Sequence, residues 1–394
     1  MSGGLYERLG VKTYINAADS YTMIGGSRMP PEVVVAMAEA SRHFVPLEEL
    51  HLRVGARIAE LTRNEAAVVT SGAAAGLTVA TAACMTGTDE KLVRKLPTLD
   101  GIEKCEVVIH RCQRNGFDMA IAQTGARLVE IGDVESTFAW QLEDAIGPRT
   151  ACIVYFTSTQ YDRGALPLAD VIRIADARGV PVVVDAAAQL PPVDNLWRYT
   201  QMGASLVIFS GGKTLFGPQS SGFVAGREAL VAACRLHVGA RISIGRPMKV
   251  GKEELAGLLA AVERYVALDH EAVRAGHEAL VGRLCAGLRE AGYAASRQYP
   301  GPTGQDYPLV RVDLGGAPFS AERLAAALRE GEPGVLVALT WDRRDVLLNP
   351  LHLREDEAEV VIARMRVVLS EALEALEAAE SAGATGAARS PDSN

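Results

Sequence analysis

Two segments of the chain read VVVDAA (residues 182–187) and LVIFSGGK (residues 206–213). Their apolar runs show no polar alternation, which is typical of strands covered by helices on both faces. The first run ends at Asp185, and the second is followed after two glycines by Lys213. Because open α/β sheets bind ligands at the carboxyl ends of their strands, we expect this acid and this base to share one crevice.

The same kind of pattern extends outward from these segments, from about residue 66 to residue 226. Short β-branched runs alternate there with Ala-rich helical stretches, as in βαβ units around a mostly parallel sheet. The sequence therefore predicts an α/β fold with a seven-stranded, mostly parallel sheet and helices on both faces. The expected strands are residues 66–70, 106–110, 127–131, 151–157, 181–186, 206–210 and 221–225.

A smaller α+β domain is expected after the sheet. Residues 253–293 have apolar side chains at helical spacing and predict a long connecting helix. The α+β domain is predicted from strands near 308–314 and 334–339, a helix near 320–330 and an amphipathic helix over 355–380. The expected division is an N-terminal arm and small-domain segment (1–40), a large domain (41–252), the connecting helix region (253–293), the small C-terminal domain (294–380) and a disordered tail (381–394).

Composition and charge limit the kinds of partner. The 394 residues are 48% apolar and 22% charged, enough to bury one large core and a smaller one. The net charge of −8 without a basic stripe argues against nucleic acid as a partner. The six cysteines lack CxxC spacing and predict buried thiols, not a metal site. No leader-like or membrane-spanning stretch is apparent, so we expect a cytoplasmic protein that does not bind membranes.

The expected pair of Asp185 and Lys213 suits pyridoxal 5′-phosphate (PLP). This cofactor needs a lysine amine to hold its aldehyde, and a carboxylate to keep its pyridine nitrogen protonated so that the ring withdraws electrons from the substrate Cα. Lys213 fits the first role and Asp185 the second. The alternative interpretation is a loop aspartate and a surface lysine with no common function.

The run VVTSGAAAG (residues 68–76) predicts a strand that enters a helix through residues with almost no side chain. Free amides at a helix N-terminus bind phosphate, and Ser71, Gly72 and Ala73 would let an anion approach the backbone closely. This turn is therefore a candidate cup for the 5′-phosphate, with close packing of strand and helix as the alternative. It matches neither the nucleotide P-loop nor the dinucleotide fingerprint.

The order of these segments resembles that of fold-type I PLP enzymes. Within them the chain resembles the bacterial selenocysteine synthase-like group, which includes D-glucosaminate-6-phosphate ammonia-lyase, over roughly residues 4–375. The markers are INA (15–17), TSGAAAGL (70–77), RNGFD (114–118), DAA (185–187), SGGK through GPQ (210–219) and IGRPMKVGKE (244–253).

The resemblance implies a role for several residues. Lys213 would hold PLP as a Schiff base, Asp185 would pair with the ring nitrogen, and Ser210 would hold the phosphate together with residues 71–73. Fold-type I enzymes usually complete each active site across a homodimer. Residues 217–219 (GPQ) would then contact the cofactor of the neighbouring subunit.

Three more residues are expected to contact the cofactor: Gln113, Gln160 and Ala187. Related enzymes place a flat side chain from a His–Arg–Asn triplet against the ring, and Gln113 stands at the place of that histidine. His110 is the other candidate for stacking, or else a histidine that packs at the strand end. Gln160 is expected to reach the 3′-oxygen of the cofactor, with a solvated loop amide as the alternative.

The substrate is expected to meet a basic loop. Arg246 and Lys249 lie with Lys252 in a Gly/Pro-bounded segment, and such side chains bind carboxylate or phosphate. A solvated basic turn is the alternative. The segment NPLHL (349–353) resembles a substrate-facing segment, although His352 is displaced from its position in relatives.

These residues predict a PLP-dependent lyase that acts on a small molecule. Lys213 would remove the Cα proton of a β-hydroxy amino acid, in particular an amino-sugar acid or its phosphate, and elimination would give a 2-oxo acid and ammonia. An aminotransferase, a racemase, a cysteine desulfurase and a seryl-tRNA selenium transferase remain open, because the same lysine and aspartate serve each. A non-enzymatic binding protein with the PLP fold is a further alternative. The expected assembly is a homodimer or a higher homo-oligomer.

Overall fold

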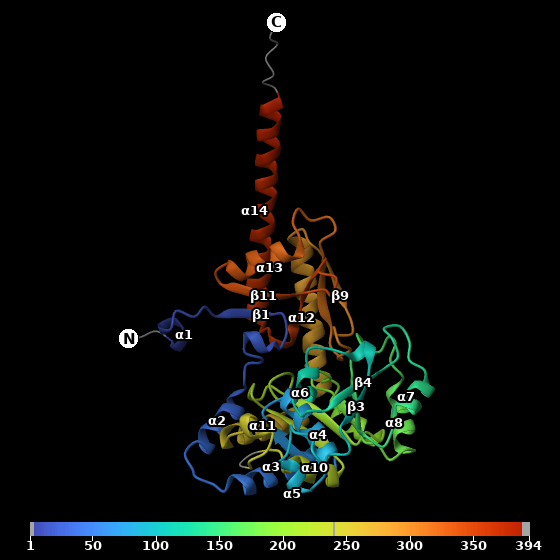
Figure 1. The fold of residues 1–394 in the computed structure, drawn as a ribbon. Helices are drawn as coiled ribbons and strands as arrows, with labels where there is room; N and C mark the ends of the chain where they lie inside the picture. Colours follow the sequence, from blue (N-terminus) through green and yellow to red (C-terminus); the bar gives the residue numbers. More distant parts are fainter. Residues whose placement is uncertain (1–3, 239–240, 388–394) are drawn as a thin grey trace. The chain divides into compact units, whose positions relative to one another are not determined.

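The computed structural model describes residues 4–238 and 241–387 and divides into two compact units (Figure 1). The larger unit comprises residues 22–270 and 302–306. The smaller unit comprises the described residues of 1–21, 271–301 and 307–394. Each unit therefore contains segments that are far apart in the sequence.

The larger unit is built on a seven-stranded sheet, as the sequence predicts. Its strands lie in the order β2-β8-β7-β6-β5-β3-β4. Only β8 is antiparallel to its neighbours, β2 and β7, and the other pairs are parallel. The strands are β2 (Ala66–Thr70), β3 (Glu106–His110), β4 (Arg127–Ile131), β5 (Thr150–Phe156), β6 (Val182–Asp185), β7 (Leu206–Ser210) and β8 (Gly222–Gly226).

Helices cover both faces of this sheet, which explains why β5, β6 and β8 are buried along their whole length. One apolar layer joins the sheet to α4 (Ala73–Thr86), α6 (Asp118–Ala122) and α10 (Glu228–Arg235). The other joins it to α3 (Leu47–Leu61), α8 (Leu168–Asp176), α9 (Asn195–Gln201) and α11 (Lys252–Ala267). Shorter or peripheral elements are η1 (Thr22–Ile24), α2 (Pro31–Ala40), α5 (Glu90–Val93), η2 (Arg111–Gln113), α7 (Ala139–Ala145) and η3 (Arg246–Met248).

The smaller unit contains a five-stranded sheet in the order β1-β11-β12-β10-β9. Only the pair of β1 and β11 is parallel. Its strands are β1 (Tyr14–Ala17), β9 (Ala294–Gln298), β10 (Leu309–Asp313), β11 (Gly334–Leu339) and β12 (Val346–Leu348). Its helices are α1 (Leu5–Arg8), α12 (His270–Glu290), α13 (Ala321–Glu330), η4 (Pro350–His352) and α14 (Glu355–Ala387).

Two helices differ from the sequence prediction. The expected single helix over 253–293 is two helices, α11 and α12, because Leu268 has an extended backbone with φ −65° and ψ 145°. Asp269, a residue type favoured at helix N-caps, precedes α12. The last helix continues past residue 380 to Ala387, and residues 388–394 of the expected disordered tail lie outside the described part of the chain.

The cysteines are all free thiols in the described structure. Five are buried, and Cys112 is partly buried. This agrees with the expectation of core thiols, because small sulfur side chains pack like apolar groups. Among the described residues, no helix has the length and apolar character needed to cross a bilayer.

We predict that Gly55→Val destabilises the larger unit by about 2 kcal/mol. An added Cβ at Gly55 would lie 2.4 Å from the Ala67 carbonyl oxygen, so α3 would have to move away from β2. The melting temperature measures this effect. Gly276→Ala, in the exposed middle of α12 with nothing within 4 Å of the new Cβ, is the control and should not lower stability. Equal losses in both variants would contradict the prediction.

Candidate functional site

Asp185 ends strand β6, between Phe156 of β5 and Ile208 of β7. Its side chain is buried, and its Oδ1 accepts a hydrogen bond of 2.9 Å from the Ala187 N–H. Burial raises the pKa of Asp185, whereas the Ala187 hydrogen bond and the charge of Lys213 lower it. The structure therefore brings the acid and the base of the two strand ends into one electrostatic pair.

Lys213 lies in a tight loop that joins β7 to β8. Glycines allow this loop to fold on itself: a Cβ on Gly212 would lie 2.6 Å from the Gln219 Cα. The Thr214 hydroxyl donates to the Leu190 carbonyl at 2.9 Å and ties the loop to the segment after β6. Lys213 is half-buried, so its amine stays accessible to a ligand, and its charge acts on the buried Asp185.

The predicted phosphate turn joins β2 to α4. Gly72 has a φ of +128°, a conformation that favours glycine, and no side chain caps the first turn of α4. The backbone amides at this helix start are therefore available to an anion. Ser71, Gly72 and Ala73 are half-buried, as a turn that binds a phosphate group requires.

Gly222 connects this turn to Ser210. As the first residue of β8, it pairs with Thr70 of β2 on one side and with Ser210 of β7 on the other. A Cβ on Gly222 would lie 3.1 Å from the Ala73 nitrogen and 2.6 Å from the Phe209 oxygen. The sequence analysis missed this glycine because its importance follows from the strand order, not from a motif.

The two candidates for ring stacking are fully buried. His110 is 0% exposed, and its Nε2 accepts from the Leu166 N–H at 3.2 Å. Burial lowers the pKa of His110 to about 4, so the ring is neutral near pH 7. Gln113 is also 0% exposed, and its Oε1 accepts from the Phe156 N–H at 3.2 Å. Neither side chain presents a face to solvent in this structure, and a stacking role for either stays a prediction.

Tyr161 is an aromatic side chain near Asp185 that the sequence analysis did not select. It is half-buried, and its backbone N–H donates to the Ser158 carbonyl at 2.8 Å. The Cys112 thiol donates to the Tyr161 carbonyl at 3.6 Å. Burial raises the pKa of Tyr161, and the charges of Asp185 and Asp118 raise it further. No motif marks Tyr161; its place follows from the turn after β5.

The remaining predicted residues are exposed or held in other contacts. Gln160 is exposed, and its amide donates to the Pro302 carbonyl at 3.2 Å. Arg246 and Lys249 are exposed before α11, while Lys252 pairs with Glu253. Their contacts with cofactor and substrate stay predictions.

Two other residues of the segments that carry the resemblance, Gln219 and His352, make contacts of their own. Gln219 is exposed and donates to the Thr22 carbonyl at 2.9 Å. In the smaller unit, His352 is buried with its Nε2 2.7 Å from the Ser20 hydroxyl.

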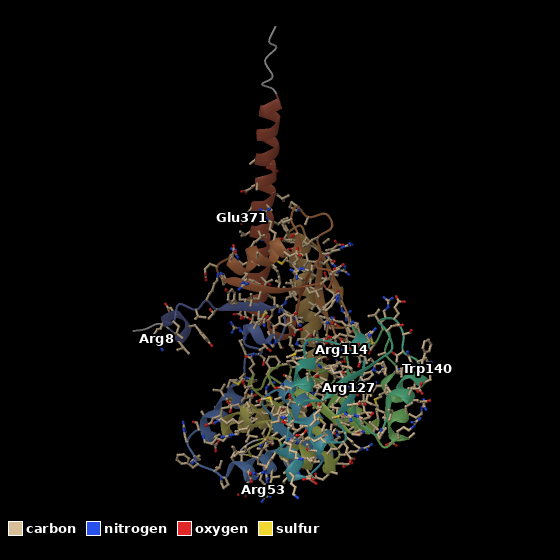
Figure 2. All side chains as sticks on the ribbon, in the orientation of Figure 1. Arg8, Arg53, Arg114, Arg127, Trp140 and Glu371 are labelled. Atoms are coloured by element: carbon tan, nitrogen blue, oxygen red, sulfur yellow. The ribbon has the colours of Figure 1, made fainter. Side chains whose placement is uncertain are left out.

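The motif RNGFD has a structural role next to the site. Arg114, labelled in Figure 2, pairs with Asp118 at the start of α6 and with Glu130 of β4. The Asn115 side chain accepts from the Phe117 N–H at 2.8 Å. These contacts fix the connection between β3 and α6.

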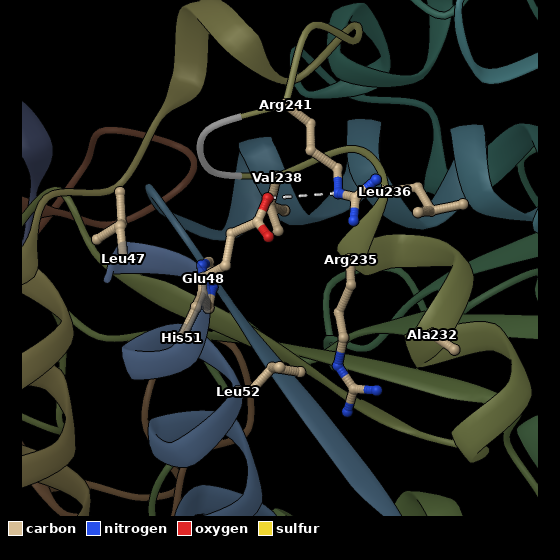
Figure 3. Close-up of a pocket in the computed structure, with 9 residues that line it drawn as sticks. All are labelled: Leu47, Glu48, His51, Leu52, Ala232, Arg235, Leu236, Val238 and Arg241. Carbon is tan, nitrogen blue, oxygen red and sulfur yellow. Dashed lines mark ion pairs between the residues drawn. The ribbon is translucent and has the colours of Figure 1, made fainter. Parts of the chain in front are cut away.

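A separate cavity of about 250 Å³ lies between α3 and α10 (Figure 3). Leu47, Leu52, Leu236 and Val238 give it apolar walls, and Arg241 pairs with Glu48 at 3.7 Å. Neither Asp185 nor Lys213 lines it. The His51 ring in this cavity hydrogen-bonds the Val69 carbonyl at 2.8 Å, which supports β2 just before the phosphate turn.

The sequence profile of the family described as L-seryl-tRNA selenium transferase matches residues 20–292. The chain belongs to this family. It is 37% identical to the 5′-C-glycyluridine monooxygenase-decarboxylase of a Streptomyces species, over 92% of each chain. It is 33% identical to the D-glucosaminate-6-phosphate ammonia lyase of Salmonella typhimurium, over 94% of this chain and 100% of that one.

Solved structures agree with the fold assignment of this family member. A structure of D-glucosaminate-6-phosphate ammonia-lyase matches with a TM-score of 0.80 at 30% identity, over 95% of this chain and 100% of that one. A structure described as SPT with PLP matches with a TM-score of 0.58 at 17% identity, over 91% of this chain and 88% of that one. The fold is therefore fold-type I, as the sequence resemblance implies.

We predict that Asp185→Asn raises the melting temperature of the cofactor-free protein at pH 7. The folded pKa of Asp185 lies above its ordinary value of 3.8, so folding disfavours the ionised carboxylate. The contribution of the protonated Asp185 carboxyl group to the stability of the folded protein is therefore fully present below pH 3.8, and it is lost as the pH rises. Melting curves from pH 4 to pH 8 should therefore show that the melting temperature of Asp185→Asn exceeds that of the wild type by less as the pH falls. Asp144→Asn, on exposed α7, should show no such trend. A lower melting temperature for Asp185→Asn at pH 7 would contradict this account.

Proposed function

We propose that the larger unit binds PLP at the strand ends that carry Asp185 and Lys213. Three observations of the chain fit this cofactor. The half-buried Lys213 amine lies near a buried carboxylate, which a protonated ring nitrogen would partner. The start of α4 has no side-chain cap, and Gly222 leaves room beside the Ala73 nitrogen. Ser210 reaches the same place through the pairing of β7 with β8.

Each of these residues then has a defined task. When bound, PLP accepts the electrons that are left at the substrate Cα after proton removal. Asp185 keeps the ring nitrogen protonated, and the turn of Ser71, Gly72 and Ala73 holds the phosphate with Ser210. Lys213 would hold the cofactor through its aldehyde, and the same amine would be the base for the Cα proton. Because Asp185 is buried, its negative charge acts on the ring with little screening by water.

We infer that the chain is a lyase that eliminates water and releases ammonia from a β-hydroxy amino acid. The proposed substrate class is an amino-sugar acid or its phosphate, and the products are a 2-oxo acid and ammonia. The observation that carries this proposal is the Asp185–Lys213 pair within a chain that aligns with the whole length of the Salmonella ammonia lyase. Arg246 and Lys249 are proposed to bind the anionic group of the substrate.

Product analysis tests the reaction. The purified enzyme is incubated with PLP and a panel of D- and L-β-hydroxy amino acids and amino-sugar acids, and ammonia and oxo acid are measured. The lyase proposal expects the two products in equal amounts without any amino acceptor. Oxo acid that forms only with an acceptor would instead identify an aminotransferase, and selenium transfer to seryl-tRNA would identify a tRNA-dependent enzyme.

A second candidate reaction is an oxidative decarboxylation. The 37% identity to the Streptomyces monooxygenase-decarboxylase over 92% of the chain supports it. Oxygen consumption together with CO₂ release from a glycyl nucleoside would favour this reaction over ammonia elimination. Equal amounts of ammonia and oxo acid, formed also without oxygen, would exclude it.

We predict that Lys213→Ala removes the visible absorbance of bound PLP and lowers kcat at least about 10³-fold. The reason is the double task of this amine, which binds the cofactor and moves the proton. The exposed Lys104→Ala is the control and should retain both properties. Unchanged turnover in Lys213→Ala would disprove the proposed site.

We predict that Tyr161→Ala weakens PLP binding about fivefold, because an aromatic face near Asp185 would be lost. Tyr161→Phe keeps this face and should bind PLP as the wild type does. Absorbance titration of the cofactor-free protein measures both dissociation constants. A loss in Tyr161→Phe as large as in Tyr161→Ala would show that the hydroxyl, not the ring, makes the contact.

We also propose that the protein works as a homodimer in the cytoplasm. The fold-type I architecture supports the dimer, because enzymes of this fold usually complete each active site across a subunit interface. The free thiols of the described chain suit a reducing compartment. Sedimentation of the purified protein at several concentrations tests the assembly, and a monomer throughout would contradict it.

A further inference from the structure

A cavity of about 490 Å³ in the larger unit is lined by neither Asp185 nor Lys213. It is lined by the end of β5, the loop from β5 to α8, the segment after β6, and α9. Tyr155, in its wall, belongs to the apolar layer that contains α8 and α9. Val183 belongs to the opposite layer, with α4. Side chains alternate along a strand, so Asp185 faces the same side as Val183, and the cavity lies across the sheet from its carboxylate.

The exposed side chains around this cavity include one acid and one base. Asp162 comes from the loop after β5, and Arg198 comes from α9. Neither makes an ion pair with another residue in the described part of the chain. Both charges act on the same phenol: Asp162 raises the pKa of Tyr199, and Arg198 lowers it, although burial is the largest cause of its rise to about 12. The two charges therefore lie close to one buried side chain.

The cavity also contains a buried acceptor. Asn195 is 5% exposed, and its Nδ2 donates to the Gln189 carbonyl at 2.6 Å. Its Oδ1 has no hydrogen-bond donor among the described residues. Leaving such an acceptor unsatisfied costs stability, and a ligand that donates hydrogen bonds would remove this cost.

Apolar side chains form another part of the wall, beside the polar Thr157, Ser158, Thr159 and Gln189. Tyr155, Leu166, Leu168 and Tyr199 are each less than 10% exposed. The Tyr155 hydroxyl is already used, because it donates to the Leu166 carbonyl at 3.1 Å. The wall therefore offers apolar surface next to the charged Asp162 and Arg198 and the acceptor of Asn195.

We propose that this cavity is a second binding site, for a free α-amino acid in its zwitterionic form. The ammonium group donates to the Asp162 carboxylate and the Asn195 Oδ1, and the carboxylate group pairs with Arg198. An aliphatic or aromatic side chain packs against Tyr199 and Leu168. A singly charged ligand would leave one of the two protein charges without a partner, and a neutral ligand would leave both, whereas a zwitterion matches both. The volume suits a small molecule.

The cavity shares one loop with the proposed active site. The backbone N–H groups of Tyr161 and Asp162 both donate to the Ser158 carbonyl, at 2.8 and 3.0 Å. Tyr161 lies near Asp185, whereas Asp162 lines the cavity. An amino acid bound to Asp162 would therefore restrict the same turn that positions Tyr161.

Calorimetric titration of the full-length protein with L-leucine tests the site. Asp162→Asn and Arg198→Gln should each weaken binding at least about tenfold, the loss expected for one charge-assisted hydrogen bond. The matched exposed controls, Asp144→Asn and Arg178→Gln, should bind as the wild type does. Lys213→Ala should also retain binding, because the cavity does not use that amine.

Two related probes test the zwitterion itself. N-acetyl-L-leucine lacks the ammonium group and isopentylamine lacks the carboxylate, so both should bind at least about tenfold more weakly than L-leucine. Isopentylamine that binds as tightly as L-leucine would overturn the proposal in favour of a simple cation site. Loss of binding in Lys213→Ala, or wild-type affinity in Asp162→Asn and Arg198→Gln, would also overturn it.

Discussion

The site depends on a carboxylate that is buried where three parallel strands end. Removing Asp185 from water disfavours its charge, and the structure offsets this with one backbone hydrogen bond and the nearby amine of Lys213. These two contacts do not fully offset the burial of the charged carboxylate, so the centre is suited to a further positive partner. A protonated heterocycle would supply one, so the electrostatics of this strand end support the proposed cofactor.

The strand order determines what surrounds this pair. Because β8 is antiparallel to β2 and β7, its first residue lies where those strands finish. Gly222 is that residue, and it lets the turn after β2 and the end of β7 approach each other. A chain with the same motifs but a different strand order would separate Ser210 from residues 71–73.

The sequence was informative where local patterns determine structure. Short β-branched runs predicted all seven strands of the large sheet, and the charged residues at the ends of two apolar runs predicted the Asp185–Lys213 pair. The short strands β1, β9 and β12 were missed, since β9 has the mostly polar sequence AASRQ and β1 finds its partner only in β11. A histidine packed at the strand end was one of the two alternatives for His110, and its burial agrees with that one. The burial of Gln113 could not be predicted, because it depends on the backbone N–H of Phe156.

The pairing of β1 with β11 joins Tyr14 to Gly334 across most of the chain. During synthesis, the first strand of the smaller unit must therefore wait until β11 has left the ribosome, whereas the strands of the larger sheet are complete at residue 226. The larger unit can thus become compact first, and the smaller unit closes last through contacts of long sequence separation, which form slowly. Loss of the first strand would leave the edge of β11 open to pairing with other chains.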